Sequence, residues 1–544
     1  MCANAIQLVR AARGLLAAAA HHHGPTPPPC RPSSGVAAPP LDHATAARPY
    51  DEIPGPKPLP LLGNSWRFFP LIGEYAGLES DDLHRTLYEQ YGPIVRFTKI
   101  LGRRDLVFIF RPEDVETTLR NEGPWPYREG TKSMEYYRQV HRKDFYQGAG
   151  SVLTDHGPKW GEVRSKVNQP MMQPRISRRY VPPIEGVAQE FLQMIRDMRD
   201  ESGELPSNFV NELFKWSLES IAYVALDTRL GCLEPSLASD SEQQTMIDAV
   251  NTILNEMYNM ELGMPLWKLI PTPAWRKFVK AQDTFLEVTM KRVQSAIERV
   301  QQRGHSEDDD PSVLERLLSR ADPKTATIMA QDMLFGGIDT TSFSTAIAMY
   351  MLSRNKEKQE ILFEEMKRFL PEKDTPISEE MLEEMKYLKA VFKECMRMKP
   401  LVPWNQRKTV KETVLSNYRV PQGVDVLMPN LTFRDSEEIY PQGQRFIPER
   451  WLKKRPVAGQ RAGSAEDFDA VSHGKHHPFA FLPFGFGVRM CVGKRFAEME
   501  MEILLAKIVR NFKVDYKYGE IRFTSKLINT PVDPLRFQLT DRSE

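Results

Sequence analysis

The sequence has almost no net charge and no long apolar run. Its 544 residues include 73 basic and 72 acidic side chains, which gives a formal net charge of +1. A balance this close to zero provides no global attraction to nucleic acid. No stretch reaches the about 20 apolar residues that a membrane-spanning helix needs. We therefore expect neither a nucleic-acid partner nor a transmembrane helix, and the hydrophobic fraction of 41% is ordinary for a globular protein.

The sequence is also poor in cysteine. Cys2, Cys30, Cys232, Cys395 and Cys491 are odd in number, far apart and without a C-x-x-C pair. This spacing argues against a disulfide framework and against a zinc finger, and it favours a reducing compartment. The 42 prolines cluster near the N-terminus and in the C-terminal third, which indicates long ordered loops around a helical body.

The first 48 residues lack acidic side chains until Asp42. Arg10 and Arg13 lie among small and apolar residues, and a stretch rich in proline, alanine and serine follows at 25–40. This composition predicts a mitochondrial transit peptide with a linker. A secretory signal peptide and a disordered tail are the alternatives, but the apolar run at 15–20 is short for the first. Because no repeat and no break in composition follow, residues 49–544 are predicted to form one domain.

Hydrophobic periodicity predicts a mainly helical chain with small β-sheets. Residues 94–98 and 105–110 have the β-branched and aromatic content of short strands. Residues 121–150 are expected to be irregular, and 453–477 are polar enough for a surface insertion. Helices are predicted at 82–91, 184–199, 210–225, 240–261, 273–302, 313–318, 324–353, 379–398 and 494–511, with short β pieces at 400–449 and 518–539.

The predicted helix at 324–353 breaks a local rule in its middle. Gly336 and Gly337 each weaken a helix by about 1 kcal/mol relative to alanine. Asp339 and Thr340 follow, with side chains that compete for backbone hydrogen bonds. Such a stretch indicates either a functional distortion, or a kink or close helix crossing. A second ambiguous stretch, 262–270, is unusually apolar for a connection and is either core packing or a patch that enters a membrane surface.

Cys491 lies in a glycine-rich loop that also contains Arg489. Zinc would need more ligands than this, and His473, His476 and His477 upstream match no zinc spacing. A nucleophilic cysteine would need a histidine partner, which no local motif supplies. A haem iron needs only one protein thiolate, in a loop whose glycines let the backbone approach the macrocycle. A plain core thiol stays open as well.

The run from Phe484 to Gly493 reads Phe-x-x-Gly-x-Arg-x-Cys-x-Gly and resembles the cysteine loop of the cytochrome P450 haem-thiolate monooxygenases. Four further matches follow the family's order along the chain, and the resemblance covers roughly residues 50–540. They are Trp160-x-x-x-Arg164, the Gly-Gly-Ile-Asp-Thr-Thr run at 336–341, the pair Glu394-x-x-Arg397 with Arg450, and Arg407.

The resemblance implies the cytochrome P450 fold, with haem b between the long central helix and the cysteine loop. It implies that Cys491 is the metal ligand, and that Asp339 and Thr340 are catalytic, holding water and relaying protons. The residues that would bind the cofactor are Trp160, Arg164, Arg407, Phe484, Arg489 and Gly493. Glu394, Arg397 and Arg450 would form a structural triad.

Residues 53–56 and 388–390 resemble the mitochondrial members of the family, and 121–128 look most like those of arthropods. This implies electrons from an adrenodoxin-like ferredoxin with its NADPH-dependent reductase. The cations that would dock the ferredoxin are Lys389, Lys393, Lys494 and Arg495. The implied location is the matrix side of the inner mitochondrial membrane, with peripheral membrane contact.

The resemblance further implies that one oxygen atom from O2 enters an apolar substrate, steroid-like, ecdysteroid-like or xenobiotic. By family position the substrate walls would come from 133–150, 252–264, 335–340, 401–406 and 527–532. The alternative functions are a haem-binding sensor or carrier that performs no oxygenation, and a haem-thiolate isomerase or dehydratase that needs no external electrons. The Asp339–Thr340 pair favours the monooxygenase, because a sensor needs no proton relay.

Overall fold

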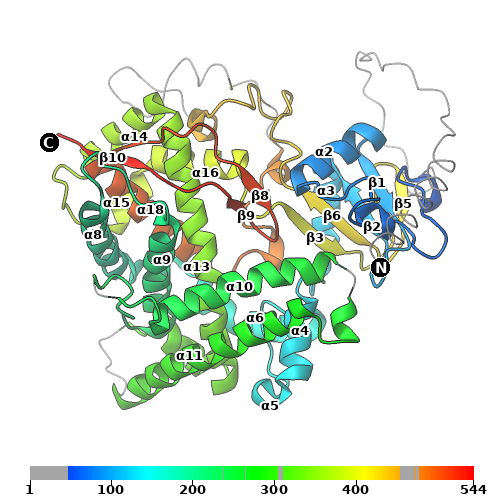
Figure 1. Ribbon diagram of the computed structural model, residues 1–544, viewed down its shortest axis with the longest axis horizontal. Helices are drawn as coiled ribbons and strands as arrows, with labels where there is room; N and C mark the ends of the chain where they lie inside the picture. The colour runs from blue at the N-terminus through cyan, green and yellow to red at the C-terminus, as the bar shows by residue number, and fades with distance from the viewer. Residues whose placement is uncertain are drawn as a thin grey trace, which may run out of the picture.

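A computed structural model describes residues 47–235, 237–263, 265–303, 310–453, 471, 474 and 477–543. Most of these residues are helical and four small sheets lie among them, so the predicted fold class is confirmed (Figure 1). Most of the predicted transit peptide and of the predicted surface insertion lies outside the described residues. Arg48 already belongs to the folded part, because its N–H donates to the carbonyl of Asn417 at 2.9 Å.

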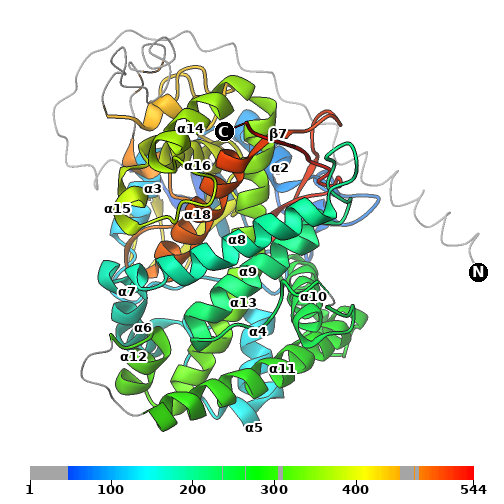
Figure 2. The same ribbon diagram turned by 90° about the vertical axis from the view of Figure 1, so that its left-hand side faces the viewer.

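Helix α13, Pro323–Arg354, runs through the centre of the helical part (Figures 1 and 2). Its side chains are buried around most of its circumference, as expected for a helix that neighbours surround. Helices α9, Phe209–Leu226, and α18, Lys494–Asn511, pack against it. Asp322 caps α13 by accepting the N–H of Thr325 at 2.9 Å.

The other helices surround this centre. Helices α10 and α11 pack against each other, and α10 also contacts α9 and α13. The bounds are α2 Ser80–Tyr91, α3 Pro112–Arg120, α6 Gly157–Met172, α7 Pro174–Arg178, α8 Val181–Met198, α10 Glu242–Leu262, α11 Pro273–Arg303, α12 Val313–Arg320, α14 Lys356–Phe369, α15 Glu379–Glu384 and α16 Lys386–Met398.

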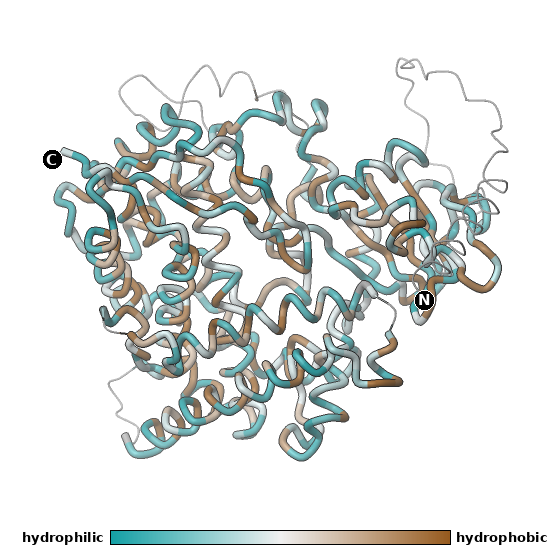
Figure 3. Tube along the Cα trace, viewed as in Figure 1, coloured by the Kyte–Doolittle hydropathy of each residue, from teal (hydrophilic) through white to brown (hydrophobic). Residues whose placement is uncertain are grey.

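The four-stranded sheet and the β4–β5 pair form a separate part beside the helices, which Figure 1 shows with α2 and α3 around it, whereas β7–β10 lie among the helices. The four-stranded sheet has the order β1-β2-β6-β3, in which β2 and β6 are parallel and the other pairs are antiparallel. The largest apolar cluster lies among the helices and includes residues of β7 and β10, and two smaller clusters lie around the four-stranded sheet (Figure 3). The strands are β1 Ile94–Phe97, β2 Leu106–Ile109, β3 Trp404–Lys408, β4 Thr413–Leu415, β5 Tyr418–Val420, β6 Asp425–Pro429, β7 Phe512–Asp515, β8 Phe523–Ser525, β9 Asn529–Pro531 and β10 Gln538–Asp541.

The expectation of irregular structure at 121–150 is wrong for its second half. Helix α4, Lys132–Tyr136, continues into a π-helical turn, Tyr137–His141, and then into α5, Lys143–Tyr146. Tertiary contacts stabilise these short pieces. The buried carboxylate of Glu261 at the end of α10 accepts the N–H and the hydroxyl of Ser133, at 2.7 and 2.8 Å.

The single helix predicted at 379–398 is two helices, because Met385 leaves the helical conformation between α15 and α16. A buried carboxylate explains the break. Glu365 of α14 accepts the N–H groups of Tyr387 and Leu388, both at 2.9 Å, and so satisfies the first turn of α16 from another element. Glu365 lies 22 and 23 positions before the two residues whose N–H groups it accepts, so no local sequence signal reveals this cap.

The two glycines of α13 do not interrupt the helix, and they have different surroundings. A Cβ on Gly337 would lie 2.6 Å from a side-chain carbon of Ile221, so α9 crosses α13 at this point without room for a side chain. A Cβ on Gly336 would meet nothing within 4 Å. Gly337 thus fits the predicted close helix crossing.

This difference predicts opposite behaviour for two matched variants. Gly336→Ala and Gly337→Ala gain the same helix propensity, but only the second forces overpacking against Ile221, which costs about 1–3 kcal/mol. Gly337→Ala should therefore be less stable than Gly336→Ala by about that amount in chemical unfolding of the holoprotein. Equal stability of the two variants would contradict the close crossing.

Candidate functional site

The loop around Cys491 is shaped by two glycines in the left-handed region. Gly485 and Gly487 have φ angles of +73° and +68°, which residues with a Cβ rarely adopt. The N–H of Cys491 donates to the carbonyl of Phe484 at 2.8 Å and closes the loop. The N–H of Gly493, the residue before α18, donates to the Cys491 thiol. The sulfur therefore has the backbone donor that stabilises a thiolate ligand.

Cys491 differs from the other two described cysteines. Cys232 and Cys395 are buried, whereas Cys491 is exposed. Surrounding protein nevertheless raises the pKa of the Cys491 thiol by burial, while the Gly493 N–H and the nearby Arg164 lower it. The sulfur thus faces a space inside the molecule and not bulk solvent, and a neighbouring cation favours its thiolate form.

Four arginines gather around this space. Burial, together with repulsion from Arg128, Arg407 and Arg164, lowers the pKa of Arg489 to about 8. Burial and the charge of Arg407 lower the pKa of Arg128 to about 10. Glu122 opposes the cluster with a single carboxylate, bound to Arg407. Four cations beside one acidic residue among those described favour a bound anion, which would restore the charged forms of the arginines.

The indole of Trp160 is independent evidence that an anion binds in this space. Trp160 is 1% exposed, and its Nε1–H has no acceptor among the described residues. The guanidinium of Arg489 lies 4.1 Å from the centre of the same indole ring. A buried donor without a partner is costly, so an acceptor oxygen at this point would satisfy it. A macrocycle with two carboxylates and an iron open to one thiolate, as in haem b, fits these donors and Cys491 together.

Arg489 and Arg407 make contacts that motif reading did not specify. Arg489 donates to the backbone carbonyls of Pro126 at 3.0 Å and Asp155 at 2.6 Å, and so ties the cysteine loop to two distant segments. Arg407 binds Glu122 through Nε. Neither Arg128 nor Glu122 was singled out from the sequence. Both fall within the stretch 121–128, whose resemblance to arthropod members was the available signal.

Asp339 and Thr340 point in different directions from α13, as consecutive helical residues do. Asp339 is 3% exposed, burial raises the pKa of its carboxyl to about 7, and its Oδ1 has no partner among the described residues. The hydroxyl of Thr340 donates to the carbonyl of Gly336 at 2.7 Å. The two residues of the predicted catalytic pair therefore differ: the Asp339 carboxyl has an oxygen without a partner among the described residues, and the Thr340 hydroxyl is bound back along the helix.

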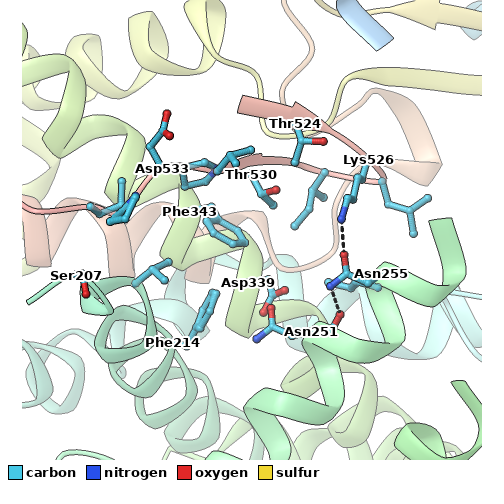
Figure 4. Close-up of a pocket in the computed structure, with 18 residues that line it drawn as sticks. Ser207, Phe214, Asn251, Asn255, Asp339, Phe343, Thr524, Lys526, Thr530 and Asp533 are labelled. Atoms are coloured by element: carbon cyan, nitrogen blue, oxygen red, sulfur yellow. Dashed lines mark hydrogen bonds between the residues drawn. The ribbon is translucent and has the colours of Figure 1, made fainter. Parts of the chain in front are cut away.

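A cavity of about 450 Å³ lies beside Asp339, between α9, α10, α13 and the β8–β9 hairpin (Figure 4). Three of the five predicted substrate walls contribute to it, namely 252–264, 335–340 and 527–532. No residue of the predicted walls 133–150 and 401–406 lines this cavity, and Ser207, Val210 and Phe214, on α9 and just before it, line it instead. Phe343, one turn beyond Asp339 on α13, also lines it.

The predicted structural triad is assembled. The carboxylate of Glu394 accepts from Arg397 at 2.7 and 2.8 Å, and from Arg450 at 3.0 Å. The indole N–H of Trp451 donates to the same carboxylate at 2.9 Å. Glu394 is fully buried, so removing one cation would leave an unpaired charge in the core.

The four predicted docking cations lie on one surface. Lys389, Lys393, Lys494 and Arg495 all act electrostatically on Glu498 of α18. Lys393 is exposed, and Lys494 is 3.7 Å from Glu498. Arg495 also donates to the carbonyl of Met172 and so has a structural contact as well. His477 bonds the N–H of Phe479, and His473 and His476 lie outside the described residues.

Comparison with known proteins decides the family. The Cytochrome P450 family model matches residues 53–538. The chain belongs to the cytochrome P450 family. It is similar to "Probable cytochrome P450 301a1, mitochondrial" of Drosophila melanogaster, with 42% identity over 93% of this chain and 90% of the relative. "Probable cytochrome P450 49a1" of the same species is 41% identical over 92% and 84%. "Cytochrome P450 CYP12A2" of Musca domestica is 37% identical over 94% of each chain.

As a cytochrome P450, the protein is a haem-thiolate monooxygenase, and its cofactor is haem b. The residues around Cys491 fit that cofactor, on the independent grounds of the arginine cluster and the orphaned Trp160 indole. Within the part of the chain that the structure describes, no helix is both long and apolar enough to cross a membrane.

The orphaned indole predicts a specific loss. Trp160→Phe keeps the aromatic packing but removes the donor, and a hydrogen bond to a charged acceptor contributes about 1.5–3 kcal/mol. Haem should therefore leave this variant roughly 10–100 times faster, as measured by capture of the haem by excess apomyoglobin. The matched control is Trp267→Phe. The indole N–H of Trp267 also has no partner among the described residues, but this residue lies in the turn after α10 and not beside Cys491. Equal haem loss from the two variants would rule out the role of Trp160.

Proposed function

We propose that Cys491 is the axial thiolate ligand of haem b, and that the enzyme inserts one oxygen atom from O2 into an apolar substrate with electrons from a ferredoxin. The observation that carries the proposal is the thiol of Cys491, which receives the Gly493 N–H and faces an internal space ringed by arginines. Bound haem b supplies the activation of dioxygen. The protein's own residues bind the cofactor, hold the substrate, and move protons and electrons.

Trp160, Arg128, Arg164 and Arg407 are the residues that we assign to the two propionates. Each carries an N–H donor, and the arginines carry the charge that two carboxylates would neutralise. Arg489 has a mainly structural role, because its bonds to the carbonyls of Pro126 and Asp155 hold the cysteine loop in place. Phe484 and Gly493 contribute backbone atoms to the same loop.

Asp339 is the group that we assign to proton transfer. Its carboxyl lines the cavity, and burial raises its pKa to about 7, where an acid can both receive and release a proton at neutral pH. The hydroxyl of Thr340 would pass that proton onward after releasing its bond to the Gly336 carbonyl. A haem-binding sensor or carrier would have no use for such a group, which favours the monooxygenase over that second candidate.

The electron donor that fits the cationic surface is acidic, as an adrenodoxin-like ferredoxin would be. Lys389 and Lys393 on α16 and Lys494 on α18 place positive charge close to the cysteine loop, where attraction speeds encounter. An NADPH-dependent reductase would supply this ferredoxin. Two of the relatives named above carry no location in their names, and one is called mitochondrial. We place this enzyme in the mitochondrion, on the matrix side of the inner membrane.

An exposed apolar patch supports peripheral contact with that membrane. Leu269 is 83% exposed and Ile270 60%, whereas Trp267 between them and α10 is buried. Core packing in 262–270 is thus seen at Trp267, and the exposed Leu269 and Ile270 are the part that we assign to the membrane surface. Leu61 and Leu71, 95% and 80% exposed, belong to a segment that packs on the loop at 98–102. Gly102 of that loop touches Pro265, which links the two apolar segments.

The reaction class is tested with isotopic oxygen. The holoenzyme, a ferredoxin, its reductase and NADPH should convert an apolar substrate, steroid-like, ecdysteroid-like or xenobiotic, into a product that carries one atom from ¹⁸O2. Binding without any product across a panel of such compounds would favour a sensor or carrier. Product formation without NADPH and ferredoxin would instead identify an isomerase or dehydratase.

The pKa of Asp339 predicts a pH dependence. A carboxyl with a pKa of about 7 is protonated below that pH and ionised above it, so its ability to donate is lost as the pH rises through 7. The fraction of consumed O2 that appears as product should fall over this range in the wild type. Asp339→Asn should give a fraction that is lower by about 10²-fold or more and independent of pH. An unchanged pH profile in the variant would show that another group controls the proton.

The docking surface predicts a change that depends on salt. Lys389→Glu with Lys393→Glu should weaken ferredoxin-supported turnover at low ionic strength while the haem spectrum stays intact, because like charges then face the partner. The matched control is Lys513→Glu with Lys517→Glu, two exposed lysines on and after β7. Equal turnover of both double variants over a range of salt concentrations would place the ferredoxin elsewhere.

A further inference from the structure

We propose that the cavity beside Asp339 selects substrates with an apolar body and a terminal carboxylate, and that Lys526 binds this carboxylate. The inference rests on the proposed function, since it names the substrate class of the same enzyme. It starts from a cation at the wall of an otherwise mostly apolar space. Among the residues that line the cavity, Lys526 is the one basic side chain.

Lys526 reaches across the cavity. It lies in the turn between β8 and β9, and Figure 4 shows its side chain extending toward α10. Its ammonium donates to Oδ1 of Asn255 at 2.8 Å, and Nδ2 of Asn255 donates to the carbonyl of Asn251 at 3.0 Å. Asn255 is thereby oriented with its acceptor toward the lysine. An ammonium has three donors, so this bond leaves two for a ligand.

The turn that carries Lys526 is fixed from behind. The carboxylate of Glu79 accepts from the hydroxyl of Thr524 at 3.0 Å and from the N–H of Ser525 at 2.6 Å. On the other strand, the N–H of Asn529 donates to the carbonyl of Leu401 at 2.6 Å. Because both strands are anchored, the backbone of the turn that carries the lysine is already ordered before a ligand binds.

The acidic residues of the cavity do not cancel this cation. Asp533 is paired with Arg522, which lies 2.6 Å away, and this pairing lowers the pKa of the Asp533 carboxyl. Asp339 is the other acid of the lining, and burial raises its pKa to about 7. Glu79, behind the turn, is engaged by Thr524 and Ser525. The lining therefore keeps a positive end at Lys526.

The rest of the lining suits hydrocarbon. The apolar side chains come from α9, α10, α13 and the β8–β9 hairpin, and they include Phe214, Leu254, Phe343, Leu527 and Ile528. A ligand that fills this space places its apolar body beside α13, while a carboxylate at its end accepts charge-assisted hydrogen bonds from Lys526. Such bonds are stronger than those between neutral groups, so the cavity should bind an acid more tightly than the ester of the same acid.

The test compares an acid with its matched ester. Dodecanoate and methyl dodecanoate are titrated into the holoenzyme, and binding is followed by calorimetry and by the shift of the haem absorption band. We expect the wild type to bind dodecanoate at least about tenfold more tightly than the ester. Lys526→Gln should lose this preference and bind the ester as before, Lys526→Arg should keep it, and Lys517→Gln, which removes an exposed charge outside the lining, should change nothing.

The outcomes separate this inference from the proposed function. Equal affinity of the wild type for acid and ester, or a full preference retained in Lys526→Gln, would overturn the carboxylate site. The reaction class would then still stand, because it is tested separately by the incorporation of one atom from ¹⁸O2 into product. Absence of any haem-thiolate spectrum in the wild type would overturn the proposed function, and the inference with it.

Discussion

The structure depends on an electrostatic imbalance around one sulfur atom. Arg128, Arg164, Arg407 and Arg489 gather near Cys491, with Glu122 bound to Arg407, at a depth that lowers the pKa of Arg489 to about 8. Like charges at such a depth repel one another and lose solvation. A dianionic cofactor removes both costs, which ties the folding of the cysteine loop to haem binding. The orphaned indole of Trp160 is explained by the same partner.

The rest of the fold holds the two sides of this space in register. On one side, α13 crosses α9 at Gly337 so closely that no side chain fits, which fixes Asp339 at the cavity wall. On the other side, Arg489 ties the cysteine loop to the carbonyls of Pro126 and Asp155. Away from the cavity, the buried Glu394 binds Arg397 and Arg450 and so joins α16 to the segment that follows β6. Catalytic and structural charges are thus kept in separate networks.

Local pattern and long-range contact account for what the sequence could and could not predict. The helix at 494–511 was predicted with the bounds that α18 has, because its periodicity and the glycine loop before it are local signals. The break at Met385 was missed, because the Glu365 carboxylate that caps α16 comes from another helix. Arg128 escaped notice for the same reason, since its place beside Arg407 and Cys491 exists only in the folded chain. Phe214 lines the cavity because α9 crosses α13 beside it, and hydrophobic periodicity does not specify which helices cross.

The central claim is that the Cys491 thiolate holds the haem iron in the space that the arginines surround. The most direct test is the absorption spectrum of the reduced holoenzyme with carbon monoxide, for the wild type, for Cys491→Ala and for Cys395→Ala, whose thiol is buried elsewhere. The wild type and Cys395→Ala should show the shifted band of a thiolate-ligated haem, and Cys491→Ala should lack it. The same band in Cys491→Ala would contradict the account.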